Sequence, residues 1–178
     1  MMQTLRRTYI DTMVFVYLIS RPTTDPLHTR SLRFFEEVEN GTYEAVITTF
    51  TYAEYTAVMK ETISRRSGKS PSAADMEKLR AEFEGFVEKE GIEVLDADDL
   101  STAFSRSEVF RWCREVVERT GTVKGRDNRW RTIGGADAVH VVLANRAGAE
   151  LYATFDEGFK AIDELGWDLK PLIIQEVY

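Results

Sequence analysis

The 178-residue sequence predicts an α/β fold: a three-layer α/β/α sandwich in which a mainly parallel sheet lies between two layers of helices. Two observations predict it. Short apolar segments bounded by turn residues alternate with longer segments whose apolar residues recur at helical spacing. This alternation runs along the whole chain, which favours parallel strands joined by crossover helices. In folds of this class, ligands bind beyond the carboxyl ends of the strands.

The first half of the chain contains the clearest turn signals. Pro22 and Pro26 interrupt the helical pattern, and Asn40-Gly41 is typical of a helix end. Between these signals, the apolar spacing assigns each segment. The predicted elements are a strand at 8–10, helices at 12–20 and 28–39, a strand at 44–48, a helix at 51–64, a polar loop at 64–72 and a helix at 73–90.

The second half repeats the alternation. The predicted elements are a strand at 92–95, a helix at 98–119, a loop at 121–135, a helix at 136–147, a strand at 150–153, a helix at 157–165 and a strand at 170–174. The loop is polar, basic and contains glycine. No interior linker is long enough to separate two domains, so we expect one domain over residues 1–178, with a helical expansion at about 64–132.

Composition narrows the class of protein. The chain is 43% hydrophobic and 30% charged, which is a globular mixture. Its apolar run from Met13 to Ile19 is too short to span a bilayer, and no signal-peptide cleavage pattern follows it. Cys113 is the single cysteine, so no internal disulfide can form. We therefore expect a cytoplasmic protein with no membrane partner.

The net charge of −7 argues against a broad basic surface for nucleic acid. It does not exclude a nuclease, because carboxylates that bind a metal ion themselves add negative charge. A local basic patch is enough to guide a phosphate backbone.

Four acidic residues are predicted to lie near one edge of the sheet. Asp11 follows the first strand, and Asp156 lies just beyond the strand at 150–153. Asp137 opens a helix after a Gly-Gly turn, and Glu54 lies about one turn into the helix that follows the strand at 44–48. Because strand ends and the starts of the following helices share one edge of a parallel sheet, these side chains can meet. Each one alone is more often a helix cap.

Two of these acids have largely apolar neighbours. Glu54 lies in the segment TYAEYTAV, and Asp137 is followed by AVHVVL. A carboxylate in such a surface is costly unless it is paired or bound to a metal. Clustered carboxylates select hard cations such as Mg²⁺ or Mn²⁺, which activate water and neutralise charge on a phosphate. The pattern therefore predicts a divalent-metal site that could promote hydrolysis at a phosphate.

The chain resembles the PIN-domain family over about residues 9–174. The family's successive signatures are similar to four segments: YIDTMVFVYLI, ITTFTYAEYTAVM, GADAVHVVLANRAGAELYATFDEGF and PLII. They match a strand followed by Asp-Thr, a hydroxyl-ending strand followed by a helical glutamate, an Asp-Ala helix, and a strand ending in Thr-x-Asp-x-x-Phe. The stretch at about 64–132 has little family signal.

The resemblance implies roles for individual residues. Asp11, Glu54 and Asp137 would be the main metal-binding acids, and Asp156 would be a more variable fourth. Hydroxyls that orient the acids or the phosphate would be those of Thr12, Thr48 and Thr154.

The resemblance also implies a biological setting. It implies a Mg²⁺- or Mn²⁺-dependent endoribonuclease, and many family members are VapC toxins of toxin–antitoxin pairs. Such toxins dimerise and are blocked by a small antitoxin protein. This chain is longer than a compact toxin of that type, and the extra residues fall in the weakly matching middle.

Other residues leave alternatives open. The segment VKGRDNRWRTIGG contains Lys124, Arg126, Arg129, Trp130 and Arg131, which suit RNA contact with a base stacked on the indole. The same residues also suit a solvated loop whose tryptophan packs on the core.

Two further features are interpreted as structural. We interpret His140 as a hydrogen-bonded core residue, and the second basic loop, with Arg65, Arg66 and Lys69, as plain surface.

Three other functions fit a fold with these acids. One is a non-catalytic module that binds RNA or protein. The others are a metal-dependent phosphatase and a nuclease that processes RNA or acts on structured DNA. A substrate panel separates them.

Overall fold

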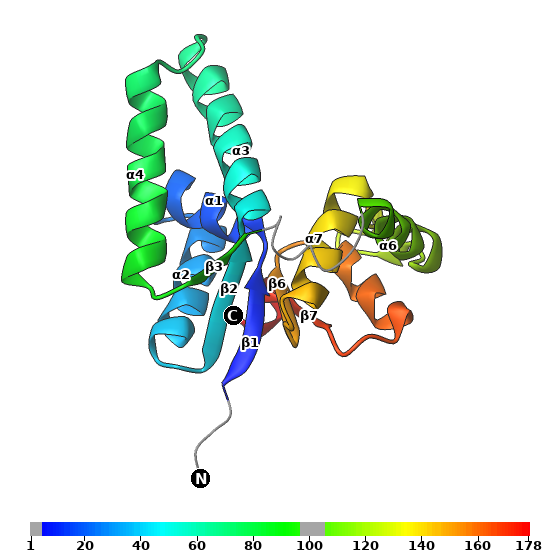
Figure 1. Cartoon of the computed structure of the whole chain (residues 1–178). Helices are drawn as coiled ribbons and strands as arrows, with labels where there is room; N and C mark the ends of the chain where they lie inside the picture. The colour runs from blue at the N-terminus through cyan, green and yellow to red at the C-terminus, as the bar shows by residue number, and fades with distance from the viewer. Residues whose placement is uncertain (1–4, 97–105) are drawn as a thin grey trace.

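The computed structural model describes residues 5–96 and 106–178, and within these ranges it confirms the predicted fold class. Five strands form one parallel sheet in the order β3-β2-β1-β6-β7. The strands are β1 (Arg6–Ile10), β2 (Tyr43–Thr48), β3 (Glu93–Leu95), β6 (Leu151–Thr154) and β7 (Lys170–Ile173). Helices cover both faces of the sheet (Figure 1).

Side chains of the central strands alternate between two cores, as a parallel sheet covered on both faces requires. On β1, Ile10 belongs to the first core and Tyr9 to the second. On β6, Ala153 and Tyr152 divide in the same way. All four are fully buried, so the sheet is covered on both sides where its central strands end.

The first face is covered by helices from the N-terminal half. They are α1 (Thr12–Ser20), α2 (Pro26–Glu39), α3 (Thr49–Ser67) and α4 (Ala73–Lys89). Asp25 caps α2 through a 2.8 Å bond from the Leu27 N–H, with Pro26 at the first helical position. Gly68 ends α3 in the left-handed conformation that glycine adopts without strain.

The helices α3 and α4 extend beyond the sheet as an antiparallel pair (Figure 1). Leu79, Phe83 and Val87 of α4 are buried against the first core. The stacked rings of Tyr55 and Phe83, 4.4 Å apart, join α3 to α4. The weakly matching middle of the sequence is thus partly an arm of the first helical layer.

The second face is covered by α6 (Arg106–Arg119), α7 (Gly135–Arg146) and the 3₁₀-helix η1 (Glu157–Leu165). Val116 of α6, Val141 of α7 and Ile162 of η1 are fully buried there. A short helix, α8 (Ile174–Val177), follows β7. No helix within the described ranges is long and apolar enough to cross a membrane.

Several boundaries differ from the predictions. The segment predicted as a loop at 121–135 contains a two-stranded antiparallel hairpin, β4 (Val123–Lys124) and β5 (Trp130–Arg131). The hairpin was not predicted because each strand is only two residues long and lies among polar residues. One turn residue, Asn128, has a φ of 62°. The helix predicted at 51–64 corresponds to α3, which begins two residues earlier, at Thr49, and ends later, at Ser67. The first part of the helix predicted at 98–119 lies outside the described residues.

Candidate active site

Asp11 lies at the carboxyl end of β1, where it precedes the first turn of α1. Its backbone N–H bonds to the Ala153 carbonyl at 3.0 Å, and its Oδ2 accepts a 2.6 Å bond from the Thr154 hydroxyl. The side chain is buried, with 8% exposure. Burial raises the pKa of Asp11 above its ordinary value, and the neighbouring Glu54 charge raises it further. His140 and the hydrogen bond from Thr154 oppose this shift. A cation beside Asp11 would offset the free-energy cost of burying its carboxylate charge.

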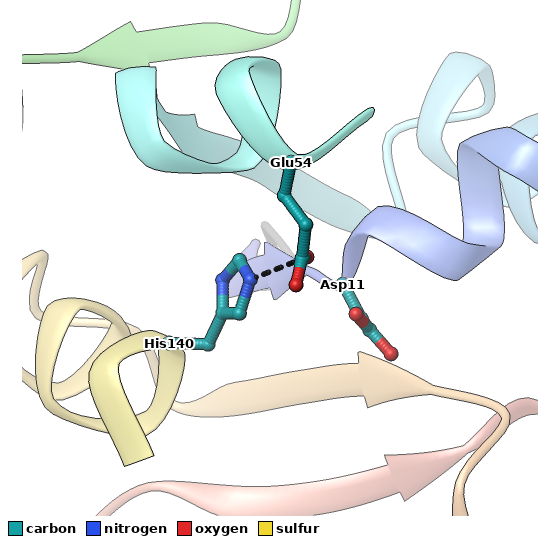
Figure 2. A group of neighbouring side chains, drawn as sticks. All are labelled: Asp11, Glu54 and His140. Atoms are coloured by element: carbon teal, nitrogen blue, oxygen red, sulfur yellow. Dashed lines mark hydrogen bonds and ion pairs between the residues drawn. The ribbon is translucent and has the colours of Figure 1, made fainter. Parts of the chain in front are cut away.

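Glu54 approaches Asp11 from the first turns of α3 (Figure 2). Its Oε2 lies 2.8 Å from His140 Nε2 on α7. This hydrogen bond lowers the pKa of Glu54, while partial burial opposes the shift. Among the described residues, the buried Thr12 hydroxyl has no hydrogen-bond partner of ordinary geometry, although it lies near enough to Glu54 to favour the ionised carboxylate. Glu54 is therefore held as an anion next to a buried aspartate.

Tyr9 connects His140 to the sheet. Its hydroxyl lies 3.0 Å from His140 Nδ1 and 2.9 Å from each of the hydroxyls of Thr48 and Thr51. One arrangement of protons satisfies the chain of bonds. The threonines donate to the Tyr9 oxygen, Tyr9 donates to Nδ1, and the Nε2–H of His140 donates to Glu54. Burial raises the pKa of Tyr9 to about 12, so it stays a donor at neutral pH.

Asp11, Glu54 and His140 each offer an atom within 4.8 Å of the others, so they form a group able to hold a metal ion. Both ring nitrogens of His140 already have partners, which makes the histidine an orienting group for Glu54. The carboxylate oxygens remain the natural ligands, and oxygen donors suit Mg²⁺ or Mn²⁺. The donor set and the cost of burying Asp11 both fit a divalent cation.

Asp137 lies outside that group of three. Its Oδ2 accepts a 2.9 Å bond from the Gly134 N–H at the start of α7, which is the capping role that aspartates at helix starts commonly have. Within the described ranges, the only bond to the Asp137 carboxylate is this one, at Oδ2. The charges of Asp11, Asp137 and Glu54 all help to raise the pKa of the buried Tyr152 hydroxyl, after the larger effect of burial. Asp137 is thus within electrostatic reach of the same edge.

Asp156 also lies outside the group. Its Oδ1 caps η1 through a 2.7 Å bond from the Gly158 N–H, and it accepts a 3.4 Å bond from Arg131. Its own N–H bonds to the Thr154 hydroxyl at 3.1 Å. The structure therefore brings Asp11 and Glu54 together, whereas Asp137 and Asp156 cap the starts of α7 and η1.

The three predicted hydroxyls have different surroundings. Thr154 bonds directly to Asp11, whereas Thr48 acts on Glu54 indirectly, through Tyr9 and His140. Thr12 is buried beside Glu54. His140 is a buried, hydrogen-bonded residue, as predicted, but its contact with Glu54 was not predicted. Its position three residues after Asp137, on one face of a helix, was the available signal.

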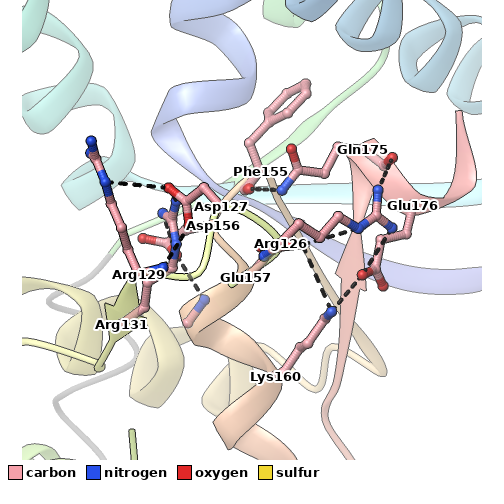
Figure 3. Close-up of polar contacts among 11 residues, drawn as sticks. Arg126, Asp127, Arg129, Arg131, Phe155, Asp156, Glu157, Lys160, Gln175 and Glu176 are labelled. Carbon is pink, nitrogen blue, oxygen red and sulfur yellow. Dashed lines mark hydrogen bonds and ion pairs between the residues drawn. The ribbon is translucent and has the colours of Figure 1, made fainter. Parts of the chain in front are cut away.

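The β4–β5 hairpin lies against η1 (Figure 3). Arg131 bonds to Asp127 at 3.1 Å and to Asp156 at 3.4 Å. Arg126 pairs with Glu157 at 3.2 Å and with Glu176 at 3.0 Å. These predicted RNA contacts are partly engaged within the protein.

The tip of the hairpin is more open. Arg129 is close to Asp127, at 3.8 Å, but its side chain is 84% exposed. Trp130 is 68% exposed, so it does not pack on the core, and Lys124 is also exposed.

Glu157 fixes the hairpin and should be sensitive to substitution. Its carboxylate is buried and accepts a 2.6 Å bond from the Arg126 N–H. A Cβ added at Gly125 would meet Glu157 Oε2 at 2.8 Å, so the contact depends on glycine there. Glu157→Ala leaves the N–H without its acceptor, and we expect a loss of about 1–3 kcal/mol.

Thermal unfolding measures this loss. The expected decrease in Tm is several degrees, at roughly 2–4 °C per kcal/mol for a chain of this size. Glu176→Ala is the control, because it removes the more exposed partner of Arg126. An equal effect of both substitutions would contradict a special role for the buried carboxylate.

Comparison with known proteins agrees with this architecture. The family model described as "PIN domain" matches residues 8–165. The chain belongs to the PIN domain family. A search of curated proteins gives no match. Among solved structures, this PIN domain is similar to the Mycobacterium tuberculosis protein VapC20, described as a toxin that cleaves the sarcin–ricin loop. The two are 16% identical, with a TM-score of 0.52 over 87% of this chain and 94% of that one.

Proposed function

We propose that this PIN domain is a divalent-metal-dependent endoribonuclease. The observation that supports the proposal best is the buried Asp11 carboxylate, placed beside an ionised Glu54 at the carboxyl edge of the parallel sheet. Members of the family are typically nucleases, and VapC20, which shares this fold, is described as a toxin that cleaves the sarcin–ricin loop.

In this proposal, Asp11 and Glu54 hold Mg²⁺ or Mn²⁺, with Asp137 and Asp156 as further ligands, directly or through water. The cation supplies an activated water and neutralises charge on the phosphate. Thr154 orients the Asp11 carboxylate through its 2.6 Å bond. His140 orients Glu54 and, by donating from Nε2, keeps one of its oxygens fixed.

The hairpin residues are proposed to contact the RNA next to this edge. Arg131 already pairs with Asp156, so it places a positive charge at the site. Trp130 and Arg129 offer an exposed ring and an exposed cation on the same hairpin, which suit a stacked base and a phosphate. Lys124 and Arg126 would add charge nearby.

The biological setting is proposed by analogy. The fold shared with VapC20 supports the toxin of a toxin–antitoxin pair, acting in the cytoplasm, forming a homodimer and blocked by a small antitoxin. The net charge of −7 favours a second candidate function, that of a non-catalytic PIN module that binds RNA or protein.

Purified protein with single-stranded RNA, structured RNA, flap DNA and a phosphomonoester tests the proposal. We expect cleavage of RNA with Mn²⁺ or Mg²⁺ and none with EDTA. Calorimetric titration with Mn²⁺ runs in parallel, because a nuclease with a narrow target would still bind the ion. Absence of both cleavage and Mn²⁺ binding would favour the non-catalytic module.

A further inference from the structure

A groove of about 270 Å³ lies between α1 and α3. Its apolar floor consists of Met13, Val16 and Val58, and its polar edge consists of Tyr17, Ser20, Thr62 and three arginines, Arg21, Arg65 and Arg66. The groove contains none of the residues assigned above to the metal site.

The two helices that form the groove both start at the candidate active site. On α3, Val58 and Thr62 lie four and eight residues after Glu54, so they continue the face of the helix that presents the glutamate. On α1, the helix that follows Asp11, Tyr17 packs edge-on against Phe155 with ring centroids 4.9 Å apart. At about 1.5 Å per residue, the arginines lie roughly 15–18 Å along the helices from the acids.

The arginines at the far end are placed across both helices. Arg66 of α3 donates a 3.0 Å bond to the Ser20 carbonyl of α1. The Arg21 guanidinium lies 5.5 Å from the centre of the Tyr17 ring. Arg65 has a side chain that is 77% exposed and pairs with Glu61 one turn earlier. Three arginines thus lie together at this end of the groove, in a chain whose net charge is −7.

The existing ion pairs do not prevent a ligand from binding. Arg21 lies 3.8 Å from Asp25 and Arg65 lies 2.6 Å from Glu61, and all four groups are partly exposed. Exposed pairs contribute little, so a phosphate can replace the carboxylates. The guanidinium fork matches the oxygens of a phosphate, and an aromatic ring beside a cation suits a stacked base.

We propose that this groove binds a single-stranded segment of the RNA substrate on one side of the scissile phosphate. The proposal rests on the proposed nuclease function, because both helices that line the groove begin at the acidic edge. Arg21 and Arg65 contact phosphates, Tyr17 and the apolar floor contact bases or sugars, and Arg66 fixes the two helices to each other. Arg65 and Arg66, interpreted from the sequence as plain surface, thereby gain a function.

The test compares two double variants of the full chain. Arg21→Gln with Arg65→Gln removes the proposed phosphate contacts. Arg80→Gln with Arg114→Gln is the matched control, because these arginines are also exposed, also form local ion pairs and lie outside the groove. Binding of a fluorescent single-stranded RNA is measured in EDTA over a series of salt concentrations, and cleavage is measured with Mn²⁺.

We expect the groove variant to bind RNA several-fold more weakly than the control. The slope of log affinity against log salt should fall by roughly 0.7 for each lost phosphate contact, about 1.4 in all. With Mn²⁺, KM for RNA should rise while kcat stays near that of the parent. Affinity and slope equal to those of the control would overturn the proposal, as expected if the groove instead takes a protein segment.

Failure of the groove and failure of the nuclease give different results. If the parent cuts RNA and the groove variant matches the control, the groove proposal fails and the nuclease stands. If no chain cuts RNA or binds Mn²⁺, but the groove variant loses affinity and salt slope, RNA binding in the groove stands and the nuclease fails. A parent that binds no RNA at all overturns the groove.

Discussion

Replacing Asp11 with asparagine is expected to reduce metal-dependent RNA cleavage by about a thousandfold or more. The reason is that a metal ion contributes several kcal/mol of charge stabilisation, and each 1.36 kcal/mol is about tenfold in rate. The side chain keeps its size, so the Thr154 hydroxyl retains an oxygen to bond to. Mn²⁺ affinity measured by calorimetry should fall together with the rate.

The stability of the same variant shows whether it is folded. Burial raises the pKa of Asp11 in the folded chain above its ordinary value of 3.8. Below pH 3.8 the Asp11 carboxyl is protonated in both the folded and the unfolded chain, so it does not lower the free energy of unfolding. As the pH rises through the folded pKa, the parent loses stability, because its folded state must bury the charge. Asparagine lacks that charge, so the metal-free variant should be at least as stable as the parent at neutral pH.

Asp163→Asn is the control for this experiment. Asp163 is 58% exposed, pairs with Lys170 and lies near the end of η1 that is opposite the Asp156 cap, so its substitution should leave cleavage and Mn²⁺ binding unchanged. An Asp11→Asn protein that is folded and still cleaves RNA at the parent rate would remove Asp11 from the site.

The second large effect is a change in stability on removing the hydroxyl group of Tyr9 or Tyr152, two tyrosines whose hydroxyls differ in their hydrogen bonds. The rings of Tyr9 and Tyr152 stack 5.6 Å apart, and both are fully buried. The Tyr9 hydroxyl has three partners, whereas the Tyr152 hydroxyl has none among the described residues. Removing either hydroxyl deletes the same atom from adjacent positions in one core.

Tyr9→Phe should destabilise the protein by about 2–4 kcal/mol, because it leaves His140 and the two threonines without their shared partner. The corresponding decrease in Tm is roughly 5–15 °C. Tyr152→Phe should raise stability by about 1 kcal/mol, since it removes a buried hydroxyl without a partner. Thermal and urea unfolding measure both changes. Losses of similar size in the two variants would contradict the role given to Tyr9.

Tyr9→Phe should also weaken cleavage while leaving Asp11 in place. The histidine that orients Glu54 would lose the bond that fixes its tautomer, and loss of such an outer partner commonly costs 10–100-fold in activity or metal affinity. Because stability and activity are measured on the same protein, assays well below its Tm separate the two effects.

The sequence was sufficient for the fold because its signals are local. Apolar spacing and turn residues defined the order of strands and helices, and the parallel arrangement follows from that order. The β4–β5 hairpin escaped detection because its strands contain only two residues each among charged neighbours. Its stability comes from Glu157 and Asp156, which lie more than twenty residues away along the chain.

The candidate site was predictable only in part for a related reason. The position of Asp11 and Glu54 follows from the shared edge of a parallel sheet. The contact between His140 and Glu54 joins residues 86 positions apart, and it depends on how α7 packs against the sheet. The capping bonds of Asp137 and Asp156 were expected of aspartates at helix starts, but the pattern could not distinguish a cap from a ligand.

The Thr154 hydroxyl links two of the acids to each other. It donates to the side chain of Asp11 and accepts from the main chain of Asp156, so a single oxygen atom bonds to two acids that follow different strands. The bond between the Asp11 N–H and the Ala153 carbonyl ties the same two strand ends together. When the sheet flexes, the two acids should therefore move as one body, and the spacing between them should vary less than the spacing of either acid from Glu54.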